Sequence, residues 1–174
     1  MREWIPVSTS PKGRLALAAV KAFGARPFDE VTVGELAAAA KVTTGALYHH
    51  FGSKLGLYAF VRTDVEQRLL DRMEGAIAAS APGSDRSAAV TAALLVGFDF
   101  AVREGFLYIL GAPPAGAEHD RLAEMLSASA APALPIFGRV LAAAWRAALV
   151  AVAEGSEPQQ ARAALLAFEF RIPS

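Results

Sequence analysis

The residues best suited to chemistry lie in one short stretch, Val42 to Lys54, which reads VTTGALYHHFGSK. Thr43 and Thr44 carry hydroxyl groups, and a helix that begins here also exposes free backbone N–H groups in its first turn. Both kinds of group suit phosphate oxygens. Gly45 and Ala46 keep the same surface low, so that a DNA groove can approach it closely. The stretch therefore indicates contact with a nucleic acid backbone.

Aromatic and apolar residues in the same stretch fit a helix with one inward face. Leu47 and Phe51 are four residues apart, so they should face inward and hold the helix on the rest of the protein. Tyr48 can reach a phosphate through its hydroxyl, although core packing is the favoured interpretation of Tyr48 and Phe51 when they are taken alone. His49 and His50 make a poor metal site. Neighbouring residues in a helix point about 100° apart, so they cannot bind one metal ion together, whereas residues four apart lie on the same face and can.

The elements that must position this stretch can be read from helix-capping signals. Ser10 and Pro11 predict the start of a first helix, which we expect Gly24 and Pro27 to stop. Residues 32–35, Thr-Val-Gly-Glu, fit a capping box, so a second short helix should run through Ala40.

A third and a fourth helix follow from the same kind of signal. Thr43 can cap the third helix, Gly52 can end it, and Ser53 can cap a long fourth helix that reaches about Ser80. The connection at residues 41–42 is short enough to force a sharp angle. That geometry is typical of a helix-turn-helix.

These residues resemble the DNA-binding module of the TetR family of transcriptional repressors. The matching positions are Val42, Thr43, Gly45, Leu47, Tyr48, His50, Phe51, Ser53, Lys54 and Leu57, preceded by Phe23-Gly24, Thr32-Val33 and Glu35-Leu36-Ala37. The resemblance covers about residues 10–60. It implies an all-α fold, with a three-helix module joined by a long connector helix to a helical domain for effector binding and dimerisation.

The resemblance also implies roles for individual residues. Thr32, Thr43, Thr44, Tyr48 and Lys54 would contact the DNA backbone, Thr44, Ala46 and His49 lie where the family reads bases, and His50 would pack inside the module. The predicted DNA-binding residues are therefore Thr32, Thr43, Thr44, Gly45, Ala46, Tyr48, His49 and Lys54.

The C-terminal part is Ala-rich and helical by its periodicity, and its aromatic residues fit plain core packing. The resemblance implies that this region holds a pocket for a small, largely hydrophobic effector, between the connector helix and the helices of residues 87–153. The predicted effector-binding residues are Phe98, Arg103, Phe106, Tyr108, His119 and Trp145. We assign residues 8–52 to the DNA-binding domain, 53–80 to the connector helix and 81–174 to the effector-binding and dimerisation domain.

Composition excludes several classes of protein. The 174 residues include no cysteine, which excludes disulfides and thiolate metal sites, and no signal-peptide pattern opens the chain, so we expect a cytoplasmic protein. Mean hydropathy is high at +0.34, yet no uncharged apolar run of about 18 residues predicts a membrane span. Residues 1–62 hold eight Lys and Arg against four Asp and Glu, a basic excess that suits phosphate binding or a solvated surface. No catalytic arrangement and no cofactor motif is present, so we do not expect an enzyme.

The sequence thus predicts a ligand-responsive DNA-binding regulator, a repressor that an effector releases from its operator. A helical small-molecule or lipid carrier without a DNA role is the alternative, and salt dependence of DNA binding separates the two. We also expect a homodimer, because one two-turn helix reads few bases. The last predicted helix, about residues 158–170, should lie at or near a contact smaller than is usual in the family, since the resemblance implies a pair of C-terminal helices at this contact and we expect one fewer here. The sequence leaves open the effector, the operator and whether the protein represses or activates.

Overall fold

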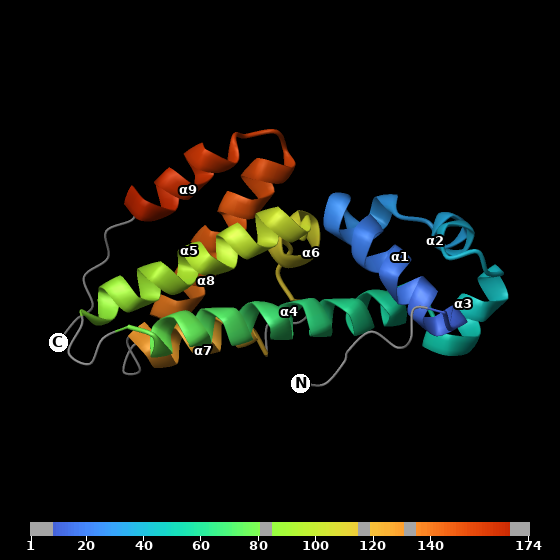
Figure 1. Ribbon diagram of the computed structural model, residues 1–174, viewed down its shortest axis with the longest axis horizontal. Coiled ribbons are helices and arrows are strands. Elements are labelled where there is room, and N and C mark those ends of the chain that lie inside the picture. The colour runs from blue at the N-terminus through green and yellow to red at the C-terminus, as the bar shows by residue number, and fades with distance from the viewer. Residues whose placement is uncertain (1–8, 81–84, 115–118, 131–134, 168–174) are drawn as a thin grey trace.

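The computed structural model describes residues 9–80, 85–114, 119–130 and 135–167, and all regular structure in these ranges is helical (Figure 1). In chain order the elements are α1 (Pro11–Ala25), the 3₁₀ turn η1 (Phe28–Glu30), α2 (Val33–Ala39), α3 (Thr44–Phe51), α4 (Lys54–Ala78), α5 (Arg86–Glu104), α6 (Leu107–Gly111), α7 (Arg121–Ala130), α8 (Pro135–Ala153) and α9 (Pro158–Ala167). The predicted all-α fold is confirmed. Of the predicted last helix, residues 168–170 lie outside the described ranges, as does the predicted break at 81–84.

The predicted helix starts are confirmed for the first four helices. The side chains of Ser10, Thr43 and Ser53 each accept a hydrogen bond from a backbone N–H in the first turn of α1, α3 and α4. Thr32 and Glu35 form a complete capping box at the start of α2. Each cap satisfies a backbone donor that has no partner within its helix, which fixes the residue at which the helix begins.

Gly24 does not stop α1, contrary to the sequence prediction. The helix continues through Gly24 to Ala25, and its cap is Arg26. A Cβ atom at position 24 would collide with the carbonyl oxygen of Gly105, so the glycine is explained by a close approach between α1 and the end of α5. Its role is tertiary, and the helix tolerates it.

The helices form an elongated molecule with α1, α2 and α3 gathered at one end (Figure 1). α4 runs from this end along the molecule and packs against α5, while α7 packs against α8. α6 lies between the two halves because it contacts both α1 and α8. The three N-terminal helices are therefore joined to the rest through α1 as well as through α4.

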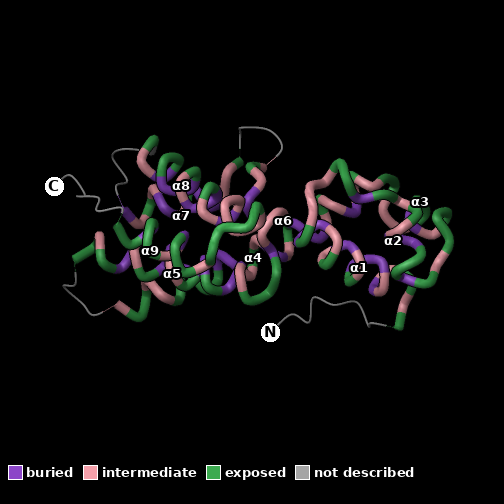
Figure 2. Tube along the Cα trace, turned by 90° about the horizontal axis from the view of Figure 1, so that it is seen from above, coloured by how far each residue is buried: buried purple, intermediate pink, exposed green. Residues whose placement is uncertain are grey.

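One hydrophobic core cluster extends through both halves, from Leu15 in α1 to Leu165 in α9. The buried positions alternate with exposed ones along each helix, so that buried segments turn toward neighbouring helices (Figure 2). Within α8, residues Ile136–Ala153 are long and apolar enough to cross a membrane by length and composition, with a mean hydropathy of 1.7, and 33% of this window is buried. α8 carries Arg139 and Arg146 and packs on α6, α7 and α9, which accounts for part of its apolar surface.

Candidate nucleic-acid interface

The connection between α2 and α3 sets the angle of the helix-turn-helix. Lys41 adopts a positive φ of 53° in this turn. The N–H of Lys41 donates to the carbonyl of Ala38 at 3.0 Å, and the N–H of Val42 donates to that of Ala37 at 3.0 Å. These bonds close the end of α2 over two residues, so α3 must leave in a new direction.

α3 has one buried face and one exposed face. Leu47 is fully buried, and Phe51 packs on Phe60 of α4 with ring centroids 5.3 Å apart. Thr43, Thr44, Gly45 and His49 are exposed, and Tyr48 is 54% exposed. Since the apolar residues are turned inward, the hydroxyls of α3 and its first-turn N–H groups remain at the surface. The structure thus places Thr43, Thr44, Gly45, Tyr48 and His49 together on one open face, with Ala46 half-buried beside them.

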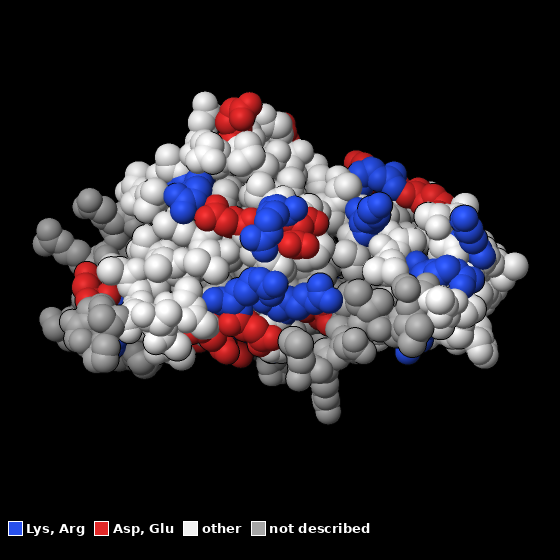
Figure 3. Space-filling view, viewed as in Figure 1, with Lys and Arg blue, Asp and Glu red and all other residues white. Residues whose placement is uncertain are grey.

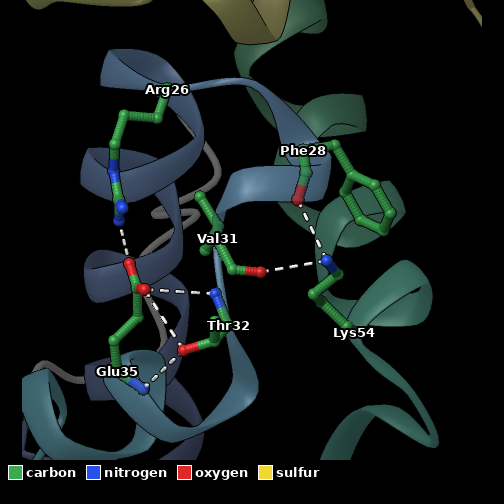
Figure 4. Close-up of polar contacts among 6 residues, drawn as sticks. All are labelled: Arg26, Phe28, Val31, Thr32, Glu35 and Lys54. Carbon is green, nitrogen blue, oxygen red and sulfur yellow. Dashed lines mark hydrogen bonds and ion pairs between the residues drawn. The ribbon is translucent and has the colours of Figure 1, made fainter.

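The capping threonines at this surface already use part of their hydrogen-bonding capacity. The Thr43 hydroxyl oxygen accepts from the Ala46 N–H at 3.3 Å. The Thr32 hydroxyl oxygen accepts from the Glu35 N–H at 3.2 Å, and the Glu35 carboxylate in turn accepts from the Thr32 N–H at 3.2 Å (Figure 4). Arg26 forms an ion pair with the same carboxylate. The capping box is therefore tied back to the end of α1.

Lys54 differs from the other predicted DNA-binding residues because its ammonium group has partners inside the module. It is half-buried and donates to the carbonyl oxygens of Phe28 at 3.0 Å and Val31 at 2.9 Å (Figure 4). Its nitrogen also lies 4.1 Å from the centroid of the Phe28 ring. The structure thus places Lys54 on the η1 turn, apart from the exposed face of α3.

Two other cations of the module, Arg14 and Lys12, also contact groups within the module. The Arg14 Nε donates to the Ala40 carbonyl at the end of α2, at 2.9 Å. Lys12 lies over the rings of Phe51 and Phe60, at 5.8 and 5.1 Å from their centroids. Figure 3 shows Lys and Arg side chains both at the module end and over the middle of that face, with Asp and Glu side chains beside them in both places. Part of the basic excess of residues 1–62 therefore holds helices together.

The structure does not bring the six predicted effector-binding residues together around one cavity. Phe98, Phe106 and Trp145 are buried core residues, and the Trp145 Nε1 donates to the Leu94 carbonyl at 3.0 Å. The exposed Arg103 forms an ion pair with Glu104, His119 is exposed, and Tyr108 is half-buried. A pocket of about 420 Å³ lies elsewhere. It is lined by Gly111, Pro113, Ala143, Arg146, Ala147, Val150, Ala151 and Glu154.

A buried polar cluster beside this pocket was missed by the sequence analysis. Arg62 of α4 and Arg146 of α8 are each only 8% exposed. Arg62 donates to the carbonyls of Ile109 at 2.9 Å and Ala112 at 2.7 Å, and Arg146 makes two hydrogen bonds to the Asp120 carboxylate, at 2.6 and 2.7 Å. Burial alone would raise the pKa of Asp120, but the bonds from Arg146 and the Ala123 N–H, together with the charges of Arg146 and Arg62, lower it. No local motif marks such contacts in a sequence.

The neighbouring histidines of α3 stand at a wide angle to each other. The rings of His49 and His50 lie 5.0 Å apart at an interplanar angle of 68°. In the described part of the chain, no group of three or more His, Cys, Asp or Glu residues is arranged to hold a metal ion. His49 is instead available at the exposed face of α3.

Comparison with known protein families finds a match over the helix-turn-helix. Residues 16–60 match the model of a family described as bacterial regulatory proteins, tetR family. No curated protein sequence matches the chain significantly.

Two solved structures share the fold over nearly the whole chain. A TetR-like transcriptional regulator from Rhodococcus sp. RHA1 superimposes with a TM-score of 0.66 at 23% identity, covering 94% of this chain and 99% of that one. A transcriptional regulator described as TerR/AcrR family, from Aquifex aeolicus VF5, superimposes with a TM-score of 0.57 at 16% identity, covering 90% of this chain and 95% of that one. With the family match at residues 16–60 and the helix-turn-helix described above, the N-terminal part of the chain is a DNA-binding domain of the tetR family type, and the chain as a whole shares its fold with TetR-like regulators.

Proposed function

We propose that this protein is a transcriptional repressor that binds operator DNA as a homodimer and is released by a small, largely hydrophobic effector, with no catalytic activity of its own. The observation that carries the proposal is the exposed face of α3, where Thr43, Thr44 and Tyr48 lie on and beside the first turn of the helix while Leu47 is buried. Such a face combines phosphate-binding groups with a profile low enough to enter a groove.

Each residue of this face has a proposed role. The hydroxyls of Thr32, Thr43, Thr44 and Tyr48 hold the DNA backbone and fix the register of the module. Ala46, His49 and Thr44 reach base edges in the major groove, where donor and acceptor patterns differ between base pairs. His49→Ala should therefore change preference at one base position by about 1–3 kcal/mol. An equal loss on all operator variants would assign His49 to the backbone.

Dimerisation supplies the second module that a two-turn helix needs for specificity. Two modules must lie about 34–36 Å apart, or a multiple of that distance, to enter successive major grooves. Exposed apolar side chains support α8 and α9 as the contact, namely Ile136, Val140, Ala143 and Ala147 on α8 and Leu166 on α9. A contiguous apolar stripe of this kind is costly in water unless another surface covers it.

Light scattering at micromolar concentration tests the dimer. A particle of twice the 18.2 kDa chain is expected, and truncation before Glu157, which removes α9, should weaken or abolish it. A monomer both with and without DNA would remove dimerisation from the proposal, and an intact dimer after truncation would assign the contact to α8 alone.

Effector binding in the C-terminal helices is supported by the pocket of about 420 Å³ between α6 and α8, whose lining is mostly apolar with Arg146 and Glu154 as its charged groups. The solid packing of Phe98, Phe106 and Trp145 means that an effector contacting these residues must first separate helices of the core. An effector acts by shifting the population of module spacings, and it must bind one spacing more tightly than the other to do so.

Selection of bound sequences from random duplex DNA tests the proposal directly. A consensus with two half-sites is expected, and its affinity should fall steeply as salt rises because counterions are displaced from phosphates. The alternative, a helical carrier of apolar small molecules or lipids, would select no sequence and would take up its ligand with little dependence on salt.

A further inference from the structure

We infer that the pocket between α6 and α8 takes an effector that joins an apolar body to a single positive charge, with the carboxylate of Glu154 as the partner of that charge. The inference rests on the proposed function and deepens it, because it names the chemical class of the effector and the residue that selects it. We call this space of about 420 Å³ the α6–α8 pocket.

The size and the lining of the α6–α8 pocket suit an apolar body. Its volume lies within the range of sites that hold small molecules. One wall is a face of α8 that carries small apolar residues at helical spacing, namely Ala143, Ala147, Val150 and Ala151. The other wall comes from Gly111 at the end of α6 and from Pro113 just after it. A ligand placed here therefore buries apolar surface on both sides.

Arg146 lines the α6–α8 pocket but does not offer it a free positive charge. Its two terminal nitrogens bond to the Asp120 carboxylate at 2.6 and 2.7 Å. Its Nε atom is buried and makes no hydrogen bond in the described part of the chain, so a ligand in the pocket does not reach it. The remaining lining residues are glycine, proline, alanine, valine and one glutamate, none of which has a side-chain donor when the carboxylate is ionised. A negatively charged effector would have to compete with Asp120 for the guanidinium.

Glu154 offers the α6–α8 pocket a carboxylate that is not already paired. It is exposed, it lines the pocket, and it directly follows the last residue of α8. Among the described residues, no ion pair joins Glu154 to a cation. The sequence contains no lysine after Lys54, so the C-terminal helices hold only arginines as cations. The carboxylate of Glu154 is therefore available to a cation from outside the chain.

The two helix ends at the α6–α8 pocket differ in the charge that meets them. At the end of α6, Arg62 donates to the carbonyls of Ile109 at 2.9 Å and Ala112 at 2.7 Å. α8 has no basic residue in its last turn, and the carboxylate of Glu154 follows it. A helix C-terminus carries a partial negative charge, so the helix itself disfavours a carboxylate there. A cationic ligand would be attracted by both the carboxylate and the end of α8.

The position of the α6–α8 pocket also connects it to the proposed dimer. Ala143 and Ala147 line the pocket and belong to the apolar stripe of α8 that we propose as the contact between two copies. A ligand in the pocket would therefore lie beside the second copy, and its affinity would depend on where that copy sits. Release from DNA requires such a difference in affinity between two spacings of the modules.

Three fluorescent probes of matched shape test the inference. Dansylethylenediamine carries a positive charge, its acetylated form is neutral, and its succinylated form is negative. Each would be titrated against the full chain and followed by dansyl fluorescence. We expect the cationic probe to bind about fivefold more tightly than the neutral one, as is typical of one partly exposed ion pair, and the negative probe to bind most weakly. The preference should shrink as salt rises.

Glu154→Gln should bring the affinity for the cationic probe down to that for the neutral probe, which the variant should bind as the wild type does. Glu157→Gln is the matched control, because Glu157 is an exposed carboxylate three residues further on that does not line the pocket. It should leave the preference in place. Ala151→Phe fills the pocket and should weaken the binding of all three probes.

Several outcomes would overturn the inference. Equal affinities for the three probes, tightest binding of the negative probe, or no binding of the cationic probe would contradict the predicted charge of the effector. A preference that survives Glu154→Gln would remove this residue from the site. Binding that survives Ala151→Phe would show that the probes occupy another surface.

Failure of the inference can be told apart from failure of the proposed function. A wild-type chain that selects no DNA would defeat the proposed function, and the charge preference of the pocket would still be measured by the same titrations. A chain that selects an operator but shows no charge preference would defeat only the inference. Where both hold, anisotropy of a labelled operator should show release by the cationic probe at lower concentration than by the neutral one, and Glu154→Gln should remove this difference. A cationic probe that fills the pocket without releasing the operator would contradict its role as an effector.

Discussion

The two ends of the molecule differ in whether their polar groups lie at the surface or in the interior. In the α1–α3 module, hydroxyl and amide groups lie at the surface, and cations such as Arg14 and Lys54 reach back from it to backbone carbonyls. Among the C-terminal helices, the large aromatics are inside, and the guanidinium groups of Arg62 and Arg146 are buried with them. Cations thus attach helices to one another at both ends, whereas exposed hydroxyl groups, which we propose to contact DNA, gather at the N-terminal end. Substitutions at the two ends should accordingly fail in different ways.

The largest expected effect is at Trp145. Trp145→Ala should lower the free energy of unfolding by about 3–5 kcal/mol, because it opens a cavity in a fully buried site. Denaturant unfolding followed by circular dichroism measures this, and Trp145→Phe, which keeps a ring but loses the bond to the Leu94 carbonyl, should cost less. An unchanged stability for Trp145→Ala would mean that the core is open at this position and would favour Trp145 as an effector-binding residue.

Replacement of Asp64, unlike replacement of Trp145, should stabilise the protein, and the gain should depend on pH. Burial raises the pKa of Asp64 from 3.8 to about 6, against the opposing charge of Arg68, and its side chain is 13% exposed. A raised pKa gives stability that is complete below the ordinary value and is lost as pH rises through about 6. Asp64→Asn should therefore stabilise the protein at pH 8 by up to about 3 kcal/mol and change little near pH 4.

Chemical denaturation at the two pH values measures the Asp64 effect. Glu74→Gln, an exposed change on the same helix, is the control and should alter little at either pH. A Asp64→Asn variant that is less stable than the wild type at pH 8 would show that the ionised carboxylate, through Arg68, contributes more than its burial costs.

Asp120 should behave in the reverse way. Its lowered pKa gives stability above the ordinary value that is lost as pH falls through the folded value. Asp120→Asn should cost about 2 kcal/mol at pH 7, because it leaves the buried Arg146 guanidinium without its counter-charge. The matched control is Asp99→Asn. Asp99 pairs with Arg162 but is 50% exposed, against 22% for Asp120, so its loss should cost less than about 1 kcal/mol. An equal loss of stability from Asp120→Asn and Asp99→Asn would show that burial does not make the Asp120–Arg146 pair stronger than the Asp99–Arg162 pair.

The smallest expected effect is at the DNA-facing end. Tyr48→Phe should weaken operator affinity by about 1 kcal/mol with no change in unfolding, because one exposed hydroxyl is removed. Tyr58→Phe is the matched control, since the Tyr58 hydroxyl accepts from Arg62 at 3.0 Å inside the molecule. It should lower stability and leave DNA affinity of the folded protein intact. A Tyr48→Phe variant with unchanged affinity would remove Tyr48 from the predicted contacts.

The two ends also differ in how far their structure follows from the sequence. The caps at Thr32 and Thr43 bond to N–H groups three residues away, so a local pattern suffices to predict them. Arg62 bonds to carbonyls 47 and 50 residues away, and no local pattern marks such partners. The effector-binding residues could not be predicted from a local pattern either, because aromatic residues on apolar helices give the same sequence pattern whether they fill a core or line a cavity. Lys54 was placed correctly on its helix, but its partners, 23 and 26 residues away, depend on how that helix packs.

The close approach of α1 to the backbone at Gly105 bears on how such regulators can be recombined. Position 24 must lack a side chain for the Gly105 carbonyl to lie where it does. A hybrid that joins residues 9–52 of this chain to the C-terminal helices of another regulator would contain Gly24 but not the backbone at Gly105 that packs against it. The graft would meet either a gap or a steric collision at that point, and no exchange of surface residues could correct it. The N-terminal module and the C-terminal helices are therefore joined in this chain by backbone shape, and a successful exchange would have to move α6 and the end of α5 together with the module.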